Sequence, residues 1–245
     1  MTALQVIEIV RRLDQGVTRP FLVRAEDDAL YVAKGREAAP RGLMAEWICA
    51  HLGRGLGLSV PEFALLDVPS ELVTAFGSQG AALGAGVVFG SRQEPNVQEF
   101  AVAQLPRIPA EERRRLLAFD WWVENADRSL TPQGGNPNLL WRAADRRLLV
   151  IDHNLAFDPA FDETAFFATH VFREEAGSLF GDLVCRAETS RWLASRLDSF
   201  DVAVDSLPPA WCWLDAGQSV PVQVDWNAAQ TRLAVRAGLE RGLQR

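Results

Sequence analysis

The stretch from Val123 to Asp158 decides the fold of this chain, and it reads VENADRSLTPQGGNPNLLWRAADRRLLVIDHNLAFD. It begins with a polar loop broken by glycine and proline, and two short apolar runs follow, Leu139–Trp141 and Leu148–Ile151. Short apolar runs on either side of a polar turn predict a β-hairpin. The second run ends in Asp152, so we expect the hairpin to carry a carboxylate at its end.

Polar side chains of this stretch are expected to converge on one spot. They are Asp127 in the loop, Asn136 or Asn138 before the first strand, and Asp152 after the second. Two carboxylates and a carboxamide offer only oxygen ligands, which suit Mg²⁺ accompanied by phosphates. Kinase chemistry needs the same set: an aspartate accepts the proton of the nucleophile, and an asparagine and an aspartate hold metal.

Bulk composition predicts a soluble cytoplasmic protein. At 245 residues and 48% hydrophobic content, the chain can bury one substantial core or two small ones. It contains no apolar run approaching the roughly 20 residues of a membrane span. The net charge of −7 argues against a nucleic-acid-binding surface, and three widely spaced cysteines suggest free thiols in a reducing compartment.

The chain contains one lysine, Lys34, among its 25 basic residues. It ends an apolar run, Leu30–Lys34, that is typical of a β-strand. Lysine is a compact point charge on a flexible stem, unlike the planar guanidinium of arginine, so Lys34 could hold a pair of phosphates. The alternative is an ordinary solvated charge at the end of a strand.

Two further features could belong to a nucleotide site. Leu43–Leu56 is expected to form an amphipathic helix with Glu46 in its first turn. Glu46 would either pair with Lys34 or simply be an acid favoured near a helix N-terminus. Gly16 and Thr18 lie in a turn that could lay backbone N–H groups and a hydroxyl over phosphates, although a lone glycine before Thr-Arg-Pro is more often an ordinary turn, and the sequence favours that interpretation.

The pattern of elements divides the chain into two parts. Residues 1–93 are expected to form a small antiparallel β-sheet with one helix, in which residues 3–13 are either strand or helix and residues 76–86 a mobile loop. Residues 94–245 are expected to be mainly helical, with a helix over Pro109–Val123 that has proline at its start and acids in its first turn.

An ordered set of motifs resembles the HipA-like kinases, and it extends over roughly residues 15–158. The catalytic part is Asn-Ala-Asp-Arg, then Asn-Pro-Asn-Leu-Leu, then Ile-Asp-His; the upstream part is Tyr31–Lys34, Glu46-Trp47 and Leu56–Pro61. The resemblance implies an α+β, two-lobed, protein-kinase-like fold. It also implies ATP and Mg²⁺ as cofactors and a Ser or Thr hydroxyl of a protein as the phosphoryl acceptor.

The same resemblance implies a role for each matched residue. Lys34 would contact the α- and β-phosphates of ATP, and Glu46 would orient it. Asp127 would accept the proton of the acceptor hydroxyl, and Asp152 would bind Mg²⁺ that bridges the phosphates. Arg128 would steady either the loop or the transferred phosphoryl group.

The sequence departs from the family pattern at the metal-binding asparagine. Its usual place, five residues after the base, is taken by Pro132, and the asparagines come at 136 and 138. An insertion around Thr131–Gly135 could loop out and restore either one. We favour Asn138, because it directly precedes the apolar strand, whereas Asn136 could cap the turn.

The histidines are expected to have no chemical role. His153 replaces the Phe of the usual Asp-Phe-Gly and is interpreted as structural, while His51 and His170 are interpreted as incidental.

Two alternatives to a protein Ser/Thr kinase stay open on the residues alone. One is a small-molecule kinase, which would use the same charges with a different acceptor pocket. The other is a nucleotide-binding pseudokinase, in which the loop insertion prevents transfer by holding both asparagines away from Asp152.

Overall fold

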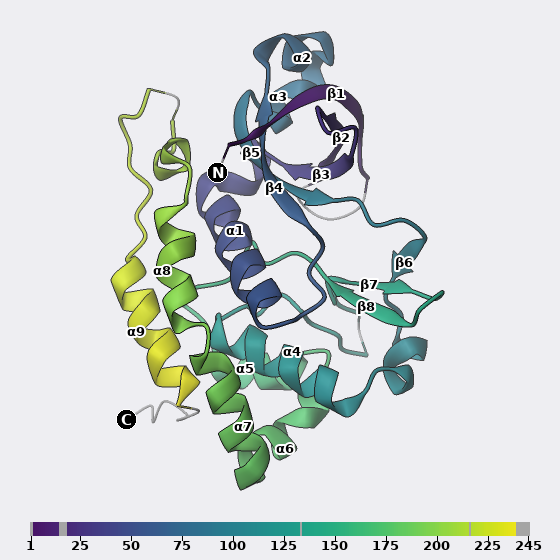
Figure 1. Ribbon diagram of the computed structural model, residues 1–245, viewed down its shortest axis with the longest axis vertical. Helices are drawn as coiled ribbons and strands as arrows, with labels where there is room; N and C mark the ends of the chain where they lie inside the picture. Colours follow the sequence, from purple (N-terminus) through teal and green to yellow (C-terminus); the bar gives the residue numbers. More distant parts are fainter. Residues whose placement is uncertain (1, 15–18, 133, 216, 239–245) are drawn as a thin grey trace. The chain divides into compact units, whose positions relative to one another are not determined.

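The computed structural model describes residues 2–14, 19–132, 134–215 and 217–238 (Figure 1). Its contacts group the chain into two compact units, each discontinuous in sequence. Unit 1 comprises Met1–Trp47, Pro61–Pro95 and Ser206–Val224, and unit 2 comprises Ile48–Val60, Asn96–Asp205 and Asp225–Arg245. A single lobe boundary after residue 93 stays a prediction about how the chain is divided.

Unit 1 is built on a closed five-stranded barrel with the order β1-β2-β3-β5-β4. The strands are β1 (Leu4–Arg12), β2 (Phe21–Ala25), β3 (Leu30–Lys34), β4 (Phe63–Val68) and β5 (Gly86–Arg92). Every pairing is antiparallel except β1 with β4, which is parallel. The expectation of a wholly antiparallel sheet was therefore wrong, because the first strand closes the barrel against β4.

Side chains alternate across β3, and this alternation places the lysine. Tyr31 and Ala33 are buried in the barrel core, so Val32 and Lys34 lie on the opposite face of the strand. The hairpin between β2 and β3 pairs Phe21 with Ala33, with Asp28 at its turn in the left-handed region (φ 62°).

Helices of unit 1 differ from the expectation in two ways. Helix α1 (Ala39–Gly55) begins four residues before Leu43, because Pro40 lies in its first turn, where a missing backbone N–H is tolerated. The expected mobile loop contains α3 (Gly80–Leu83), preceded by α2 (Ser70–Ala75), and Leu83 lies in the barrel core. Unit 1 thus contains more than the one helix expected.

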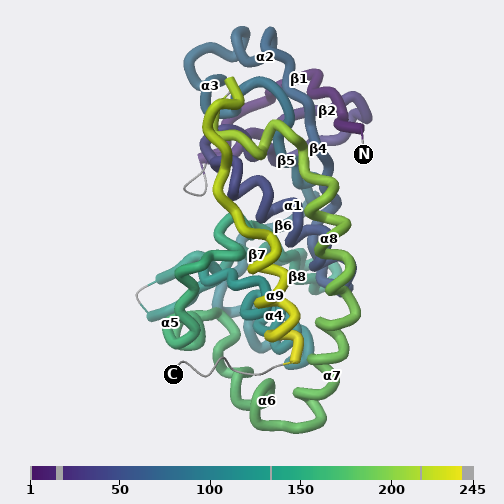
Figure 2. Tube along the Cα trace, turned by 90° about the vertical axis from the view of Figure 1, so that its left-hand side faces the viewer, coloured from purple at the N-terminus to yellow at the C-terminus, as the bar shows by residue number. Residues whose placement is uncertain are grey.

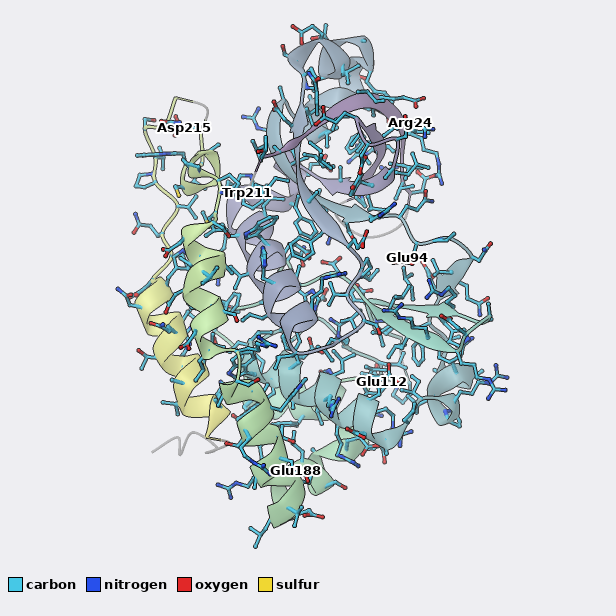
Figure 3. The ribbon with its side chains drawn as sticks, viewed as in Figure 1. Arg24, Glu94, Glu112, Glu188, Trp211 and Asp215 are labelled. Atoms are coloured by element: carbon cyan, nitrogen blue, oxygen red, sulfur yellow. The ribbon has the colours of Figure 1, made fainter. Side chains whose placement is uncertain are left out.

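Ser206–Val224 returns to unit 1 after the chain has passed through unit 2. Trp211 (labelled in Figure 3) is buried, and its indole N–H donates to the carbonyl of Val87 in β5 at 2.8 Å. The indole of Trp47 donates to Ser206 Oγ at 2.8 Å. These two bonds join a late segment of the chain to β5 of the barrel and to α1.

Unit 2 is mainly helical. Its elements are β6 (Val97–Glu99), α4 (Ala110–Trp122), β7 (Leu139–Arg142), β8 (Arg147–Val150), α5 (Glu163–Thr169), α6 (Ala176–Gly181), α7 (Leu183–Ala194), α8 (Leu197–Asp205) and α9 (Trp226–Ala237). Asp162 caps the N-terminus of α5 by accepting from the N–H groups of Thr164 and Ala165, and Asp225 caps α9 by accepting from the N–H of Ala228. Helix α9 packs along α8 in both views (Figures 1 and 2).

The predicted hairpin and the helix before the loop are confirmed. Strands β7 and β8 pair antiparallel with Leu139 opposite Val150, and β6 adds a third strand beside β7. Helix α4 spans Ala110–Trp122 and buries every residue from Leu116 onwards. Within the described ranges, no helix combines the length and apolar character that crossing a bilayer requires.

Candidate active site

The loop after α4 brings Asp127 and Asn138 together. Asn138 Nδ2 donates to Asp127 Oδ2 at 2.8 Å, although the two residues are 11 positions apart. Asn136 Nδ2 lies 3.4 Å from the same oxygen, a much weaker contact. Asn138 is buried and Asn136 is exposed. Of the two predicted asparagines, Asn138 is therefore the one that the fold fixes beside the predicted base.

The inserted residues fold into a turn of their own. Thr131 and Gly134 pair across it, and Thr131 Oγ1 donates to the Gly134 carbonyl at 2.8 Å. At Gly135, a Cβ atom would lie 2.4 Å from the carbonyl oxygen of Ser129, so only glycine fits this approach. The turn therefore absorbs the extra length and returns the chain to Asp127.

Asn138 and Asp152 lie at the same end of the hairpin. The backbone N–H of Ile151 donates to the Asn138 carbonyl at 3.2 Å, which continues the β7–β8 pairing by one position. Both Asn138 (φ 50°) and Asp152 (φ 60°) adopt the left-handed conformation. Asn and Asp tolerate this conformation better than other side chains, and such residues cluster at functional sites.

Arg128 is fully buried and holds this loop in place. Its Nε donates to Asp120 Oδ2 at 2.7 Å, and its Nη1 donates to the Asn138 carbonyl at 2.5 Å and to the Ile151 carbonyl at 3.2 Å. Its Nη2 lies 3.2 Å from His153 Nε2. Of the two roles foreseen for Arg128, these contacts fit the steadying of the loop.

In unit 1, Lys34 and Glu46 form a salt bridge. Their side chains are 10% and 3% exposed, so this is a buried pair and not a solvated charge at a strand end. Glu46 lies seven residues into α1 and outside its first turn, so preference for a helix N-terminus does not explain it. The backbone beside Lys34 is also tight, since a Cβ on Gly35 would lie 2.0 Å from the Leu83 carbonyl oxygen.

The expected phosphate turn with Gly16 and Thr18 lies outside the described residues. Its two flanks meet, because the N–H of Leu13 donates to the Pro20 carbonyl at 2.8 Å.

Two functional candidates escaped the sequence reasoning. Asp120 of α4 is completely buried and binds Arg128, and His170, interpreted as incidental, is also buried and lies 3.1 Å from Asp120 Oδ2 through Nε2. Asp120 had a recognisable signal, since it stands alone in the apolar run LLAFDWWV, where a helical carboxylate cannot avoid burial. His170 had none.

The oxygen donors suit Mg²⁺ only in company with phosphate. Asp152 supplies a carboxylate and Asn138 an amide oxygen, the ligand types that Mg²⁺ takes. Among the described residues there is no group of three or more His, Cys, Asp or Glu that could hold a metal by itself. This donor set fits an ion that shares its ligands with a bound nucleotide and water.

Comparisons with known proteins bear on the family and the fold of the chain. A search of curated proteins found no match. Among solved structures, a Helicobacter pylori proinflammatory kinase, CtkA, is similar with a TM-score of 0.55 at 13% identity, over 95% of this chain and 98% of that one. Identity this low shows a shared fold alone. The family model described as HipA-like kinase matches residues 6–238. The chain therefore belongs to the HipA-like kinase family.

Proposed function

We propose that this kinase transfers the γ-phosphoryl group of ATP, with Mg²⁺, to a Ser or Thr hydroxyl of a protein acceptor in the cytoplasm. The observation that carries the proposal is the 2.8 Å contact between Asp127 and Asn138 across the insertion. It supports an intact catalytic loop, because the extra residues form a separate turn.

Asp127 is the proposed general base. The acceptor oxygen forms a bond to the γ-phosphorus, the bond from that phosphorus to the β,γ-bridging oxygen breaks, and ADP leaves. The hydroxyl proton passes to the Asp127 carboxylate. The amide of Asn138 fixes the orientation of that carboxylate.

Lys34 is the proposed contact to the α- and β-phosphates, and Glu46 holds its ammonium in place. Asp152 and Asn138 are the proposed protein ligands of Mg²⁺, which neutralises phosphate charge when it is bound. Because Asn138 and Asp152 lie at the same end of the hairpin, the geometry argues against a pseudokinase in which the asparagines are held away from Asp152. The cytoplasmic location rests on three free cysteines, Cys49, Cys185 and Cys212.

Calorimetry of ATP binding tests the nucleotide site. Wild-type protein and Asp152→Asn are titrated with ATP, with and without Mg²⁺. We expect Mg²⁺-dependent binding by the wild type and its loss in Asp152→Asn. An absence of binding under both conditions would remove the kinase proposal, and binding without metal dependence would indicate a pseudokinase.

The acceptor class is tested with ATP labelled at the γ-phosphate. Label retained on Ser or Thr of this chain or of an added protein supports a protein acceptor. Label found only on small molecules that carry a hydroxyl group would replace it with a small-molecule kinase.

A further inference from the structure

A buried polar cluster lies beneath the catalytic loop in unit 2. It consists of Asp120, Asn125, Arg128 and His170, whose residues are 0%, 0%, 0% and 1% exposed. Asp120 Oδ1 accepts from Asn125 Nδ2 at 2.8 Å and from Arg128 Nη2 at 3.4 Å. Asp120 Oδ2 accepts from Arg128 Nε at 2.7 Å and lies 3.1 Å from His170 Nε2. Every acceptor position of the carboxylate is therefore used.

Hydrogen bonding assigns the charge state of the cluster. The backbone N–H of Phe172 donates to His170 Nδ1 at 3.1 Å, so Nδ1 is unprotonated and Nε2 carries the proton that it donates to Asp120. Burial lowers the pKa of His170, which outweighs the opposite effect of Asp120. Burial alone would raise the pKa of Asp120, but Arg128 and His170 outweigh it and hold that pKa well below its usual range. One carboxylate, one guanidinium and one neutral imidazole thus share the site.

The same cluster joins the catalytic loop to the segment Thr169–Val171, which begins with the last residue of α5. The N–H of Leu130 donates to the Thr169 carbonyl at 2.9 Å, and the N–H of Val171 donates to the Arg128 carbonyl at 3.1 Å. Between these two bonds, Ser129 pairs with His170 as an isolated antiparallel bridge. The His170 side chain that binds Asp120 therefore belongs to the segment that is pinned along the loop.

Arg128 links the buried cluster to the residues of the proposed site. It directly follows Asp127, and its Nη1 binds the carbonyls of Asn138 and of Ile151, the residue before Asp152. The proposed base, Asp127, is thus next to Arg128 in the chain. Of the proposed metal ligands, Asn138 is bonded to the guanidinium through its carbonyl, and Asp152 follows a residue that is bonded in the same way. Asp120 is the one acidic side chain among the described partners of Arg128, so it sets the plane of the guanidinium.

We propose that Asp120 and His170 are positioning residues for phosphoryl transfer: they lock Arg128, and through it they hold the base, the metal ligands and the Thr169–Val171 segment in one arrangement. This inference rests on the proposed function. The cluster acts through other residues and touches no substrate.

The test compares Asp120→Asn, His170→Ala and the conservative His170→Gln with a matched control, Glu175→Gln. Glu175 is also buried and ion-paired to α4 through Arg113, and among the described residues its ion pairs are with α4 and not with the catalytic loop. For each variant we would measure the Mg²⁺ concentration that half-saturates ATP binding, kcat for ADP formation, and hydrogen exchange at the Leu130 and Val171 amides.

We expect Asp120→Asn and His170→Ala to raise the half-saturating Mg²⁺ concentration and lower kcat by about 10–100-fold, the usual effect of removing a group that orients metal ligands. Metal-independent ATP affinity should stay unchanged. His170→Gln should restore most of the activity, because its amide can still donate to Asp120. Both amides should lose protection in Asp120→Asn and keep it in Glu175→Gln.

Equal losses in Glu175→Gln, or wild-type kcat and Mg²⁺ dependence in a folded Asp120→Asn, would overturn the inference. If Asp120→Asn does not fold, His170→Ala decides by the same measurements. A wild type that binds no Mg²⁺-ATP would refute the proposed function, and with it the role in transfer. Amide protection would then decide whether the cluster locks the loop: retained protection in Asp120→Asn overturns that part, and lost protection supports it.

Discussion

Replacing Asn138 by glycine tests which of the two asparagines, Asn136 or Asn138, serves the proposed catalytic loop. Asn138 adopts φ 50°, where alanine would be strained and glycine is not, so Asn138→Gly removes the side chain without forcing the backbone to move. The matched variant is Asn136→Gly, two residues away in the same loop.

The distances determine the expected size of each effect. Asn138 donates to Asp127 at 2.8 Å from a buried position, and a hydrogen bond to a charged group contributes about 1.5–3 kcal/mol. At about 1.4 kcal/mol per factor of ten, kcat/KM should fall by roughly 10- to 150-fold, before any loss of a metal ligand is added. Asn136 is exposed and makes a 3.4 Å contact, so Asn136→Gly should cost about 0.5 kcal/mol or less, a change under about 3-fold.

Intrinsic ADP formation from Mg²⁺-ATP is the assay, since it requires no knowledge of the acceptor. Urea unfolding of both variants is the control, because each glycine also destabilises by about 0.5–1 kcal/mol through unfolded-chain entropy. If Asn136→Gly lost as much activity as Asn138→Gly, or if Asn138→Gly kept wild-type kcat/KM, the assignment of Asn138 to the catalytic loop would be refuted.

Three other outcomes are expected. Lys34→Arg should lower kcat/KM for ADP formation by about 100-fold while the protein stays folded, because a guanidinium cannot replace the compact ammonium paired with Glu46. Gly135→Ala should cost about 1–3 kcal/mol in urea unfolding and reduce ADP formation, since its Cβ would lie 2.4 Å from the Ser129 carbonyl oxygen; wild-type values for both would contradict the described turn. The free energy of unfolding should decrease as pH falls from about 7.5 to about 5.5, because the folded state holds the pKa of His170 below 6.5 and so binds fewer protons than the unfolded chain. His170→Gln should flatten this dependence of unfolding free energy on pH. An equal dependence in the wild type and the variant would exclude His170 as its source.

Features with a strong local signal were readable from the sequence. The hairpin over residues 139–150 combines two apolar runs with a polar turn, and α4 has proline before its start and acids in its first turn. The start of α1 was expected at Leu43, yet Pro40 and Gly42 lie in the first turns of this helix, where the absent N–H of proline is harmless. The pattern of apolar and polar residues was enough to predict the type of each of these elements, whereas the first residue of α1 depended on how proline is accommodated in a first helical turn.

Features that depend on distant pairing were not readable. Closure of the barrel pairs Leu4 with Leu66. Trp211 donates a hydrogen bond to the carbonyl of Val87, which is 124 positions earlier in the sequence. No periodic pattern in the sequence predicts either contact. His170 is a similar case, because nothing near it in sequence shows that it lies against a buried aspartate.

Arg128 and Lys34, each taken within its own unit, make different demands on a cationic side chain. Arg128 satisfies a carboxylate and backbone carbonyls at once, which needs several N–H donors in a rigid plane. The site of Lys34 favours a compact charge. Its ammonium is paired with Glu46 at the end of β3, beside a backbone that leaves no room for a Cβ at Gly35. In a chain with a single lysine, the strongest clue to the proposed nucleotide site was therefore the residue type that the sequence otherwise avoids.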